Sequence, residues 1–157
     1  MVYVMNKNWF QVGLSIISLK ESVMNKEIIS TNLATVQVHF DAEKAGDWEK
    51  IKEMYTDDIV WERACVKQFV EGKEEVAAAY VELFSGLRDC DFHSLDRFAT
   101  EDRVVDDCIF SFVVAKEGIM PLPVDTKAEM RLVHIFEMHE GKVSRELVME
   151  SSPEPLE

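Results

Sequence analysis

The sequence predicts an α+β domain in which three helices precede an antiparallel meander, so that a curved sheet wraps round helices on one face. Segments with helical spacing of apolar residues fill the first part of the chain, and four β-rich segments follow one another from residue 91 to residue 150. At 157 residues, 47% of them apolar, the chain is long enough to bury one core. It shows no internal repeat and no interdomain linker, so we expect one domain.

Three helices are expected before the sheet. The first covers residues 31–45, where the Ser-Thr-Asn cluster at its start can cap a helix. The second is short and follows Gly46, which breaks the chain, and Asp47, which can cap it. The third covers residues 73–87 after a glycine-led loop. The positions expected to face inward are Leu33, Val36, Phe40, Trp48, Ile51, Met54, Val76, Tyr80, Leu83 and Leu87.

The strands are expected at apolar runs bounded by turn residues. A turn at residues 56–58 precedes a first strand over residues 59–66. The remaining four strands are expected at DFHSLDRFA, RVVDDCIFSFVV, TKAEMRLVHIFEM and KVSRELVME, joined by the tight turns TED and HEG and by a longer proline-containing loop or lid, KEGIMPLPVD.

The net charge and the cysteine pattern exclude several classes of partner and site. Thirty acidic residues against 17 basic residues give a formal net charge of −13, which repels phosphate backbones and anionic lipid, so we expect neither nucleic acid nor membrane as a partner. Cys65, Cys90 and Cys108 are odd in number and have neither CxxC nor zinc spacing. We therefore expect reduced thiols in a cytoplasmic protein, with no disulfide, no metal and no cofactor.

The N-terminal segment is treated apart from the domain. Its stretch NWFQVGLSIISLK has the apolar character of a signal peptide, but no small-x-small cleavage site follows, and Met24 would itself make an ordinary start. We expect residues 1–30 to form an appendage, as an extra helix or disordered, residues 31–150 to form the domain, and residues 151–157 to be a flexible tail.

Three features occur in order along the chain: residues 36–62 (VQVHFDAEKAGDWEKIKEMYTDDIVWE), a helix that follows Gly72, and a closing hairpin with HIFEM before its turn and EGKV after it. In these features the chain resembles ketosteroid isomerases and SnoaL-like polyketide cyclases of the nuclear transport factor two-like superfamily. The resemblance spans residues 31 to about 150. It implies a cone-shaped α+β barrel whose helices and concave sheet enclose an apolar cavity, often in a homodimer.

The resemblance also implies a catalytic set, and this chain departs from it at all three positions. Ketosteroid isomerases bind an oxyanion with a helix tyrosine and a strand aspartic acid, and move the proton with an aspartate after the first strand. These positions fall on His39, on His134 and on Arg63, with Glu62 beside it. Steroid isomerisation by that mechanism is therefore not expected. We still expect the chain to have the apolar cavity that the resemblance implies.

Strand alternation gives an independent reason to consider His134. It places Met130, Leu132, His134, Phe136 and Met138 on one face, and a hairpin turn at Glu140-Gly141 puts His134 opposite Leu147. His39 lies at the edge of the inward helix stripe, and a buried imidazole requires a partner. We expect His134, His39 and Glu62 as catalytic candidates. The pocket-lining candidates are Trp61, Tyr80, Phe84, Asp106, Phe110, Met120, Leu132, Phe136 and Leu147.

Two functions remain open on the sequence. One is a cofactor-independent acid–base enzyme, an isomerase, cyclase or dehydratase acting on a small apolar carbonyl compound, because histidine titrates near neutral pH. The other is a non-catalytic, dimeric ligand-binding or assembly domain, since fold does not determine function. Metal binding is a weaker idea because no local ligand spacing occurs.

Overall fold

The computed structural model describes residues 7–157, with side chains from residue 20 onward. Its elements are α1 (Lys7–Ala45), α2 (Trp48–Met54), β1 (Tyr55–Arg63), the 3-10 helix η1 (Ala64–Val66), β2 (Gln68–Glu71), α3 (Lys73–Ser85), β3 (Leu87–Ala99), β4 (Arg103–Val114), β5 (Lys127–His139), β6 (Lys142–Glu150) and β7 (Glu154–Pro155).

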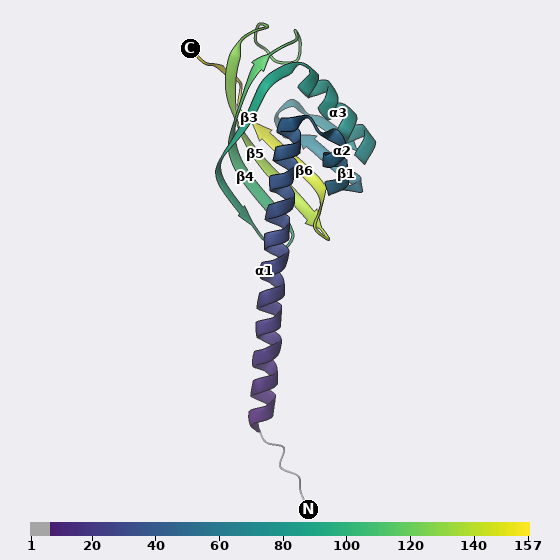
Figure 1. Ribbon diagram of the computed structural model, residues 1–157, viewed down its shortest axis with the longest axis vertical. Coiled ribbons are helices and arrows are strands. Elements are labelled where there is room, and N and C mark those ends of the chain that lie inside the picture. Colours follow the sequence, from purple (N-terminus) through teal and green to yellow (C-terminus); the bar gives the residue numbers. More distant parts are fainter. Residues whose placement is uncertain (1–6) are drawn as a thin grey trace, which may run out of the picture.

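The strands form one curved sheet in the order β2-β1-β6-β5-β4-β3, with β7 added beside β5. The three helices lie on its concave side, as Figure 1 shows. The predicted α+β class is thus confirmed, with one correction: β1 pairs with β6 in parallel, while the other pairings are antiparallel. A parallel pair needs a long crossover, and α3 with the four strands β2, β3, β4 and β5 supplies it.

Helix α1 is longer than predicted. It is one continuous helix of 39 residues, and its N-terminal part extends well beyond the sheet (Figure 1). The predicted cap at residues 30–32 is wrong, because Thr31 donates to the carbonyl of Glu27 inside the helix and Asn32 reaches the carbonyls of Thr100 and Glu101. No proline lies between Lys7 and this point, so the helix propagates through it. The expectation for residues 1–6 lies outside the described residues.

Three further expectations about the elements need correction. The predicted turn at residues 56–58 belongs to β1, since α2 passes directly into that strand. The short strand β2 was not predicted. The tail was expected to fray, but its β7 segment pairs with Ala128 and Glu129 of β5, because β6 ends at Glu150 and leaves that part of β5 open for pairing.

Loop 115–126, predicted as a loop or lid, is fixed to the junction of α3 and β3. The backbone N–H groups of Ala115 and Lys116 both donate to the carbonyl of Gly86. A Cβ on Gly86 would lie 2.2 Å from Cγ1 of Ile119, so only glycine permits this approach. The contact of Ile119 with Gly86 places the following residue, Met120, in the core.

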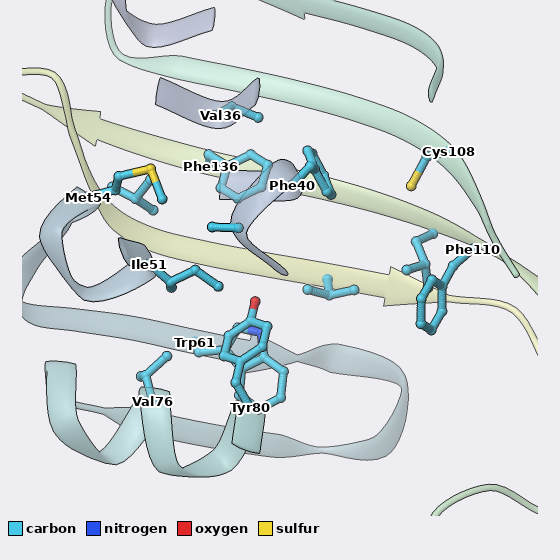
Figure 2. Close-up of a cluster of buried hydrophobic side chains, with 14 of the residues drawn as sticks. Val36, Phe40, Ile51, Met54, Trp61, Val76, Tyr80, Cys108, Phe110 and Phe136 are labelled. Carbon is cyan, nitrogen blue, oxygen red and sulfur yellow. The ribbon is translucent and has the colours of Figure 1, made fainter. Parts of the chain in front are cut away.

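The core fills the space between the helices and the concave face of the sheet (Figure 2). Along β5 every second residue is buried, from Ala128 to Met138, which confirms the predicted alternation. Across the described residues, no helix has the length and hydropathy required to cross a bilayer.

Candidate functional site

A carboxyl group lies at the centre of the buried polar side chains. Glu146 on β6 is fully buried. Tyr80 on α3 donates a hydrogen bond to its Oε1 at 2.8 Å, and Tyr55 at the start of β1 donates to its Oε2 at 3.1 Å. Three elements that are distant in sequence therefore converge on one carboxyl.

Both predicted histidines lie beside this carboxyl. Nε2 of His39 is 3.8 Å from Oε2 of Glu146, and Nε2 of His134 is 3.9 Å from Oε1. Both imidazoles are buried among aromatic rings, and His134 stacks on Phe136 with an interplanar angle of 8°. The helix and the sheet thus each contribute an imidazole that approaches the same group, at contact distance but beyond hydrogen-bond distance.

A second buried carboxyl completes the cluster. Glu43 lies one helical turn after His39, and its Oε2 is 3.7 Å from Nε2 of that histidine. This oxygen and both ring nitrogens of His39 have no hydrogen-bond partner among the described residues. Unpaired buried polar atoms are costly, about 1–3 kcal/mol each, so the cluster is not arranged for stability alone.

Burial sets the protonation of the four groups. It lowers the pKa of His39 to about 3, assisted by the positive field of His134 and Arg97, and lowers the pKa of His134 to about 3, again assisted by Arg97. Both imidazoles are therefore neutral near pH 7. Burial raises the pKa of Glu146 to about 7 against the opposing hydrogen bonds from the tyrosines.

The pKa of Glu43 is raised well above its ordinary value, first by burial and then by the charge of Glu146. The cluster near neutral pH thus contains one acid that keeps its proton, one carboxyl poised between its two forms, and two neutral imidazoles. Such divergent carboxyl groups are typical of acid–base sites.

A small cavity adjoins this cluster. Its volume is about 40 Å³, room for a few water molecules. Of the residues predicted from the sequence, seven line it: Trp61, Tyr80, Phe84, Phe110, Met120, Leu132 and His134. Glu43 lines it as well, whereas Glu146 and His39 lie behind Tyr80 and the other lining side chains.

The mouth of the cavity contains a paired arginine. Arg63 donates to both carboxylate oxygens of Glu150, at 2.9 and 2.8 Å, and to Gln68 at 3.2 Å. Arg63, Glu150, Met120 and Met130 also line an outer pocket of about 270 Å³. These four side chains therefore separate the inner cavity from the outer pocket.

The structure places four predicted site residues elsewhere. Glu62 lies on the opposite face of β1 from Trp61 and accepts from Arg145 at 2.6 Å. Phe136 is buried against His39 without lining the cavity. Asp106 borders a separate pocket between α1 and β3, where it accepts from Arg97 at 2.6 Å.

Leu147 is the fourth, and its displacement has a local cause. It pairs with Ile135, while His134 pairs with Val148, which lines the cavity in its place. The register shifts by one residue between Glu137 and Met138, and a bulge of one residue exchanges the two faces of a strand. The other two histidines, His93 and His139, are exposed.

Sequence reasoning missed Glu146, Tyr55 and Glu43. Strict alternation from the turn directs Glu146 outward, and only the bulge directs it inward. Glu43 was within reach, since helical spacing of four residues places it beside His39. Tyr55 was expected on the same face of the second helix as Trp48 and Ile51, as a core residue, whereas it begins β1 and donates to Glu146.

One group of potential metal ligands occurs among the described residues. Asp106, Cys108 and His134 offer ligand atoms within 4.8 Å of one another, all of them buried. Asp106 already accepts from Arg97 and Ser94. The neighbouring guanidinium disfavours a cation there, and burial raises the pKa of the Cys108 thiol, which disfavours the thiolate that binds metals.

Comparison with known proteins gives the family. A family model of the SnoaL-like domain matches residues 36–146, which is most of the folded domain just described. The chain belongs to the SnoaL-like domain family. The resemblance found in the sequence is thereby confirmed, while a comparison with curated proteins finds no match.

Solved structures share the fold at low identity. A protein assigned to the SnoaL-like polyketide cyclases from Jannaschia sp. CCS1 is 21% identical with a TM-score of 0.71, over 79% of this chain and 88% of that one. IdmH from Streptomyces antibioticus, assigned as a polyketide cyclase, is 16% identical with a TM-score of 0.66, over 76% and 91%. An LEH-like epoxide hydrolase from M. tuberculosis is 11% identical with a TM-score of 0.65, over 78% and 84%. At these identities the likeness shows the fold of this SnoaL-like domain.

Proposed function

We propose that this SnoaL-like domain is a cofactor-independent acid–base enzyme that isomerises, cyclises or dehydrates a small apolar carbonyl compound. The observation that carries the proposal is the pair of buried carboxyl groups, Glu146 and Glu43, whose environments give them different protonation states beside one cavity. The names of two similar structures, both assigned as polyketide cyclases, support the same class of chemistry.

Each carboxyl has its own role in this proposal. Glu43 lines the cavity with an unpaired oxygen and keeps its proton, so it donates a hydrogen bond to the substrate carbonyl and stabilises the enolate. The α-proton passes through the hydroxyl of Tyr80, which donates its own proton to Oε1 of Glu146 at 2.8 Å. Returning the proton along the same path to another carbon completes an isomerisation without a net change in protons.

The imidazoles support these carboxyls as neutral groups. His134 lies against Oε1 and His39 against Oε2 of Glu146, both within 4 Å. A neutral imidazole can donate a hydrogen bond to the carboxylate once it forms without adding a buried charge. His134, which lines the cavity, is also in reach of the substrate.

Exchange of α-protons tests the proposal without knowledge of the natural substrate. We expect the protein to accelerate exchange of the α-protons of small ketones such as acetone or cyclohexanone with deuterium in D₂O, followed by NMR. Glu146→Gln should reduce the rate by about 10²-fold or more. Glu137→Gln is the matched control, because Glu137 is a glutamate on the outer face of β5 that pairs with Arg145.

The pH profile adds a second criterion. The exchange rate should rise as pH passes through about 7, where Glu146 loses its proton, and fall at higher pH when Glu43 ionises. If the ketones bind but exchange no faster than in buffer, the domain is a ligand-binding module of the same fold, and the enzymatic proposal is wrong.

We also propose a homodimer formed through the outer face of the sheet, in the cytoplasm. Support comes from the apolar side chains on that face, among them Phe98, which is 57% exposed, and Met149, which is 40% exposed. The described cysteines are free thiols, as expected in a reducing compartment. Sedimentation velocity should show a dimer that Phe98→Glu converts to a monomer; a monomeric unmodified protein would contradict the proposal.

A further inference from the structure

The indole of Trp61 presents an unpaired donor at the cavity. The side chain lines the cavity and is 2% exposed. Its Nε1–H finds no acceptor in the part of the chain that the structure describes. Buried indole N–H groups normally have an acceptor, so this one is available to a ligand.

Trp61 lies beside two other residues that line the cavity, Tyr80 and Arg63. Its ring centroid is 4.8 Å from that of Tyr80, which holds Glu146, and Figure 2 shows the two rings overlapping. The guanidinium of Arg63, which lines both the cavity and the outer pocket, lies 5.9 Å from the centroid of the Trp61 ring. The indole is therefore a neighbour both of the tyrosine that donates to Glu146 and of the arginine shared by the two pockets.

The other polar groups on the cavity are mostly engaged. Arg63 and Glu150 bind each other through two hydrogen bonds, and the hydroxyl of Tyr80 donates to Glu146. Among the described residues that line the cavity, the fully buried side-chain atoms without a hydrogen-bond partner are Nε1 of Trp61 and Oε2 of Glu43. With Glu43 protonated, these two groups are hydrogen-bond donors beside the imidazole of His134, and each needs an oxygen acceptor.

We propose that Trp61 is a specificity-determining residue whose indole N–H binds a second oxygen of the substrate. The substrate is then a compound with two oxygen acceptors on an apolar skeleton, one at Glu43 and one at Trp61. The inference rests on the proposed function for the role of the first oxygen, and it adds the second. A compound with one oxygen leaves the indole N–H unpaired and binds more weakly.

Two probes of nearly the same shape isolate this second contact. In 1,4-cyclohexanedione both ends carry oxygen, whereas 4-methylenecyclohexanone replaces one oxygen by carbon. We expect the dione to bind about fivefold more tightly, the effect of one neutral hydrogen bond. In ¹⁵N-labelled protein the dione alone should shift the indole N–H resonance of Trp61, which is identified by its loss in Trp61→Phe.

Variants complete the design. Trp61→Phe should bind the two probes equally, while Trp48→Phe, the matched control, should keep the preference because Trp48 packs on Tyr80 and Phe84 outside the cavity lining. If Trp61→Phe does not fold, the indole resonance of Trp61 is assigned by elimination from Trp9→Phe and Trp48→Phe, and its response to the dione decides the question. Equal binding of both probes, an unmoved indole resonance, or no binding of either probe would overturn the inference.

The same probes separate this inference from the enzymatic proposal. Glu146→Gln should abolish α-proton exchange and keep the preference for the dione, since it leaves Trp61 in place. A protein that shifts its indole resonance with the dione yet never exchanges α-protons would contradict the enzymatic proposal and retain Trp61 as a ligand-recognition residue.

Discussion

The two faces of the sheet use the same residue types in opposite ways. On the outer face Arg145 joins Glu62 at 2.6 Å and Glu137 at 3.1 Å, so each of these charges has a partner near solvent. On the inner face the next residue, Glu146, is fully buried, and His134 lies 3.9 Å from it without a hydrogen bond between them. Exposed ion pairs such as these cost the protein little stability. A buried carboxyl beside imidazoles that do not hydrogen-bond to it lowers stability, and such groups are typical of functional sites.

The largest difference in the free energy of unfolding is expected between substitutions at Glu146 and at its neighbour Arg145 on β6. Glu146→Ala removes a buried side chain and leaves the hydroxyls of Tyr55 and Tyr80 without an acceptor, and we expect it to lower the free energy of unfolding by about 3–5 kcal/mol. Arg145→Ala, the matched control, should cost within about 1 kcal/mol. Urea unfolding measures both, and similar losses would mean that the two faces do not differ as described.

Glu146 should also make the free energy of unfolding depend on pH. The pKa of Glu146 is raised to about 7 in the folded protein, so its contribution to stability is fully present below its unfolded pKa and is lost as pH rises through about 7. In Glu146→Gln this loss is absent. The free energy of unfolding of the variant relative to the unmodified protein should therefore increase by about 3 kcal/mol between pH 4.5 and pH 7.5.

The free energies of unfolding of Glu146→Gln and of the unmodified protein must be subtracted, because two other buried groups also titrate. The pKa values of His39 and His134 are lowered to about 3 by burial, so these groups make stability rise with pH up to their unfolded pKa and oppose the trend from Glu146. They contribute equally to both proteins and cancel in the comparison. A difference that stays constant with pH would contradict the buried, titrating carboxyl.

The order of elements was largely predictable because it depends on periodicity. The apolar spacing of α3 and the alternation of β5 are local patterns, and both elements form where they were predicted. The parallel pairing of β1 with β6 has no such pattern, because it depends on how α3 and the four strands between them fold back. Helix α1 was cut short because a capping cluster also fits inside a helix.

The site was half predictable for a similar reason. His134 and His39 follow from regular elements, so their inward direction could be read from the sequence. Glu146 depends on a shift of one residue in the pairing of β5 with β6, which leaves the composition of the strand unchanged and reverses its faces. The central residue of the cluster was therefore the one that alternation assigned to solvent.

A smaller effect, of opposite sign, is expected at His39. Its two ring nitrogens have no partner among the described residues, and its neighbours include Phe40, Tyr55 and Phe136. His39→Leu should raise the free energy of unfolding by about 1–2 kcal/mol, because it removes unsatisfied polar atoms from an aromatic site. His93→Leu on the outer face should have no effect, and destabilisation by His39→Leu would show that the imidazole has a stabilising partner.

The smallest effect is expected on the outer face itself. Arg131 forms an ion pair with Asp107 between β5 and β4, and its side chain is 58% exposed. At a protein concentration at which sedimentation shows monomer, Arg131→Gln should change the melting temperature by no more than about 2 °C, and 1 M NaCl should remove the difference because salt screens exposed charges. A larger loss that salt leaves unchanged would place this pair in a covered environment, and the contrast between the exposed ion pairs of the outer face and the buried Glu146–histidine cluster of the inner face would then hold only for part of the sheet.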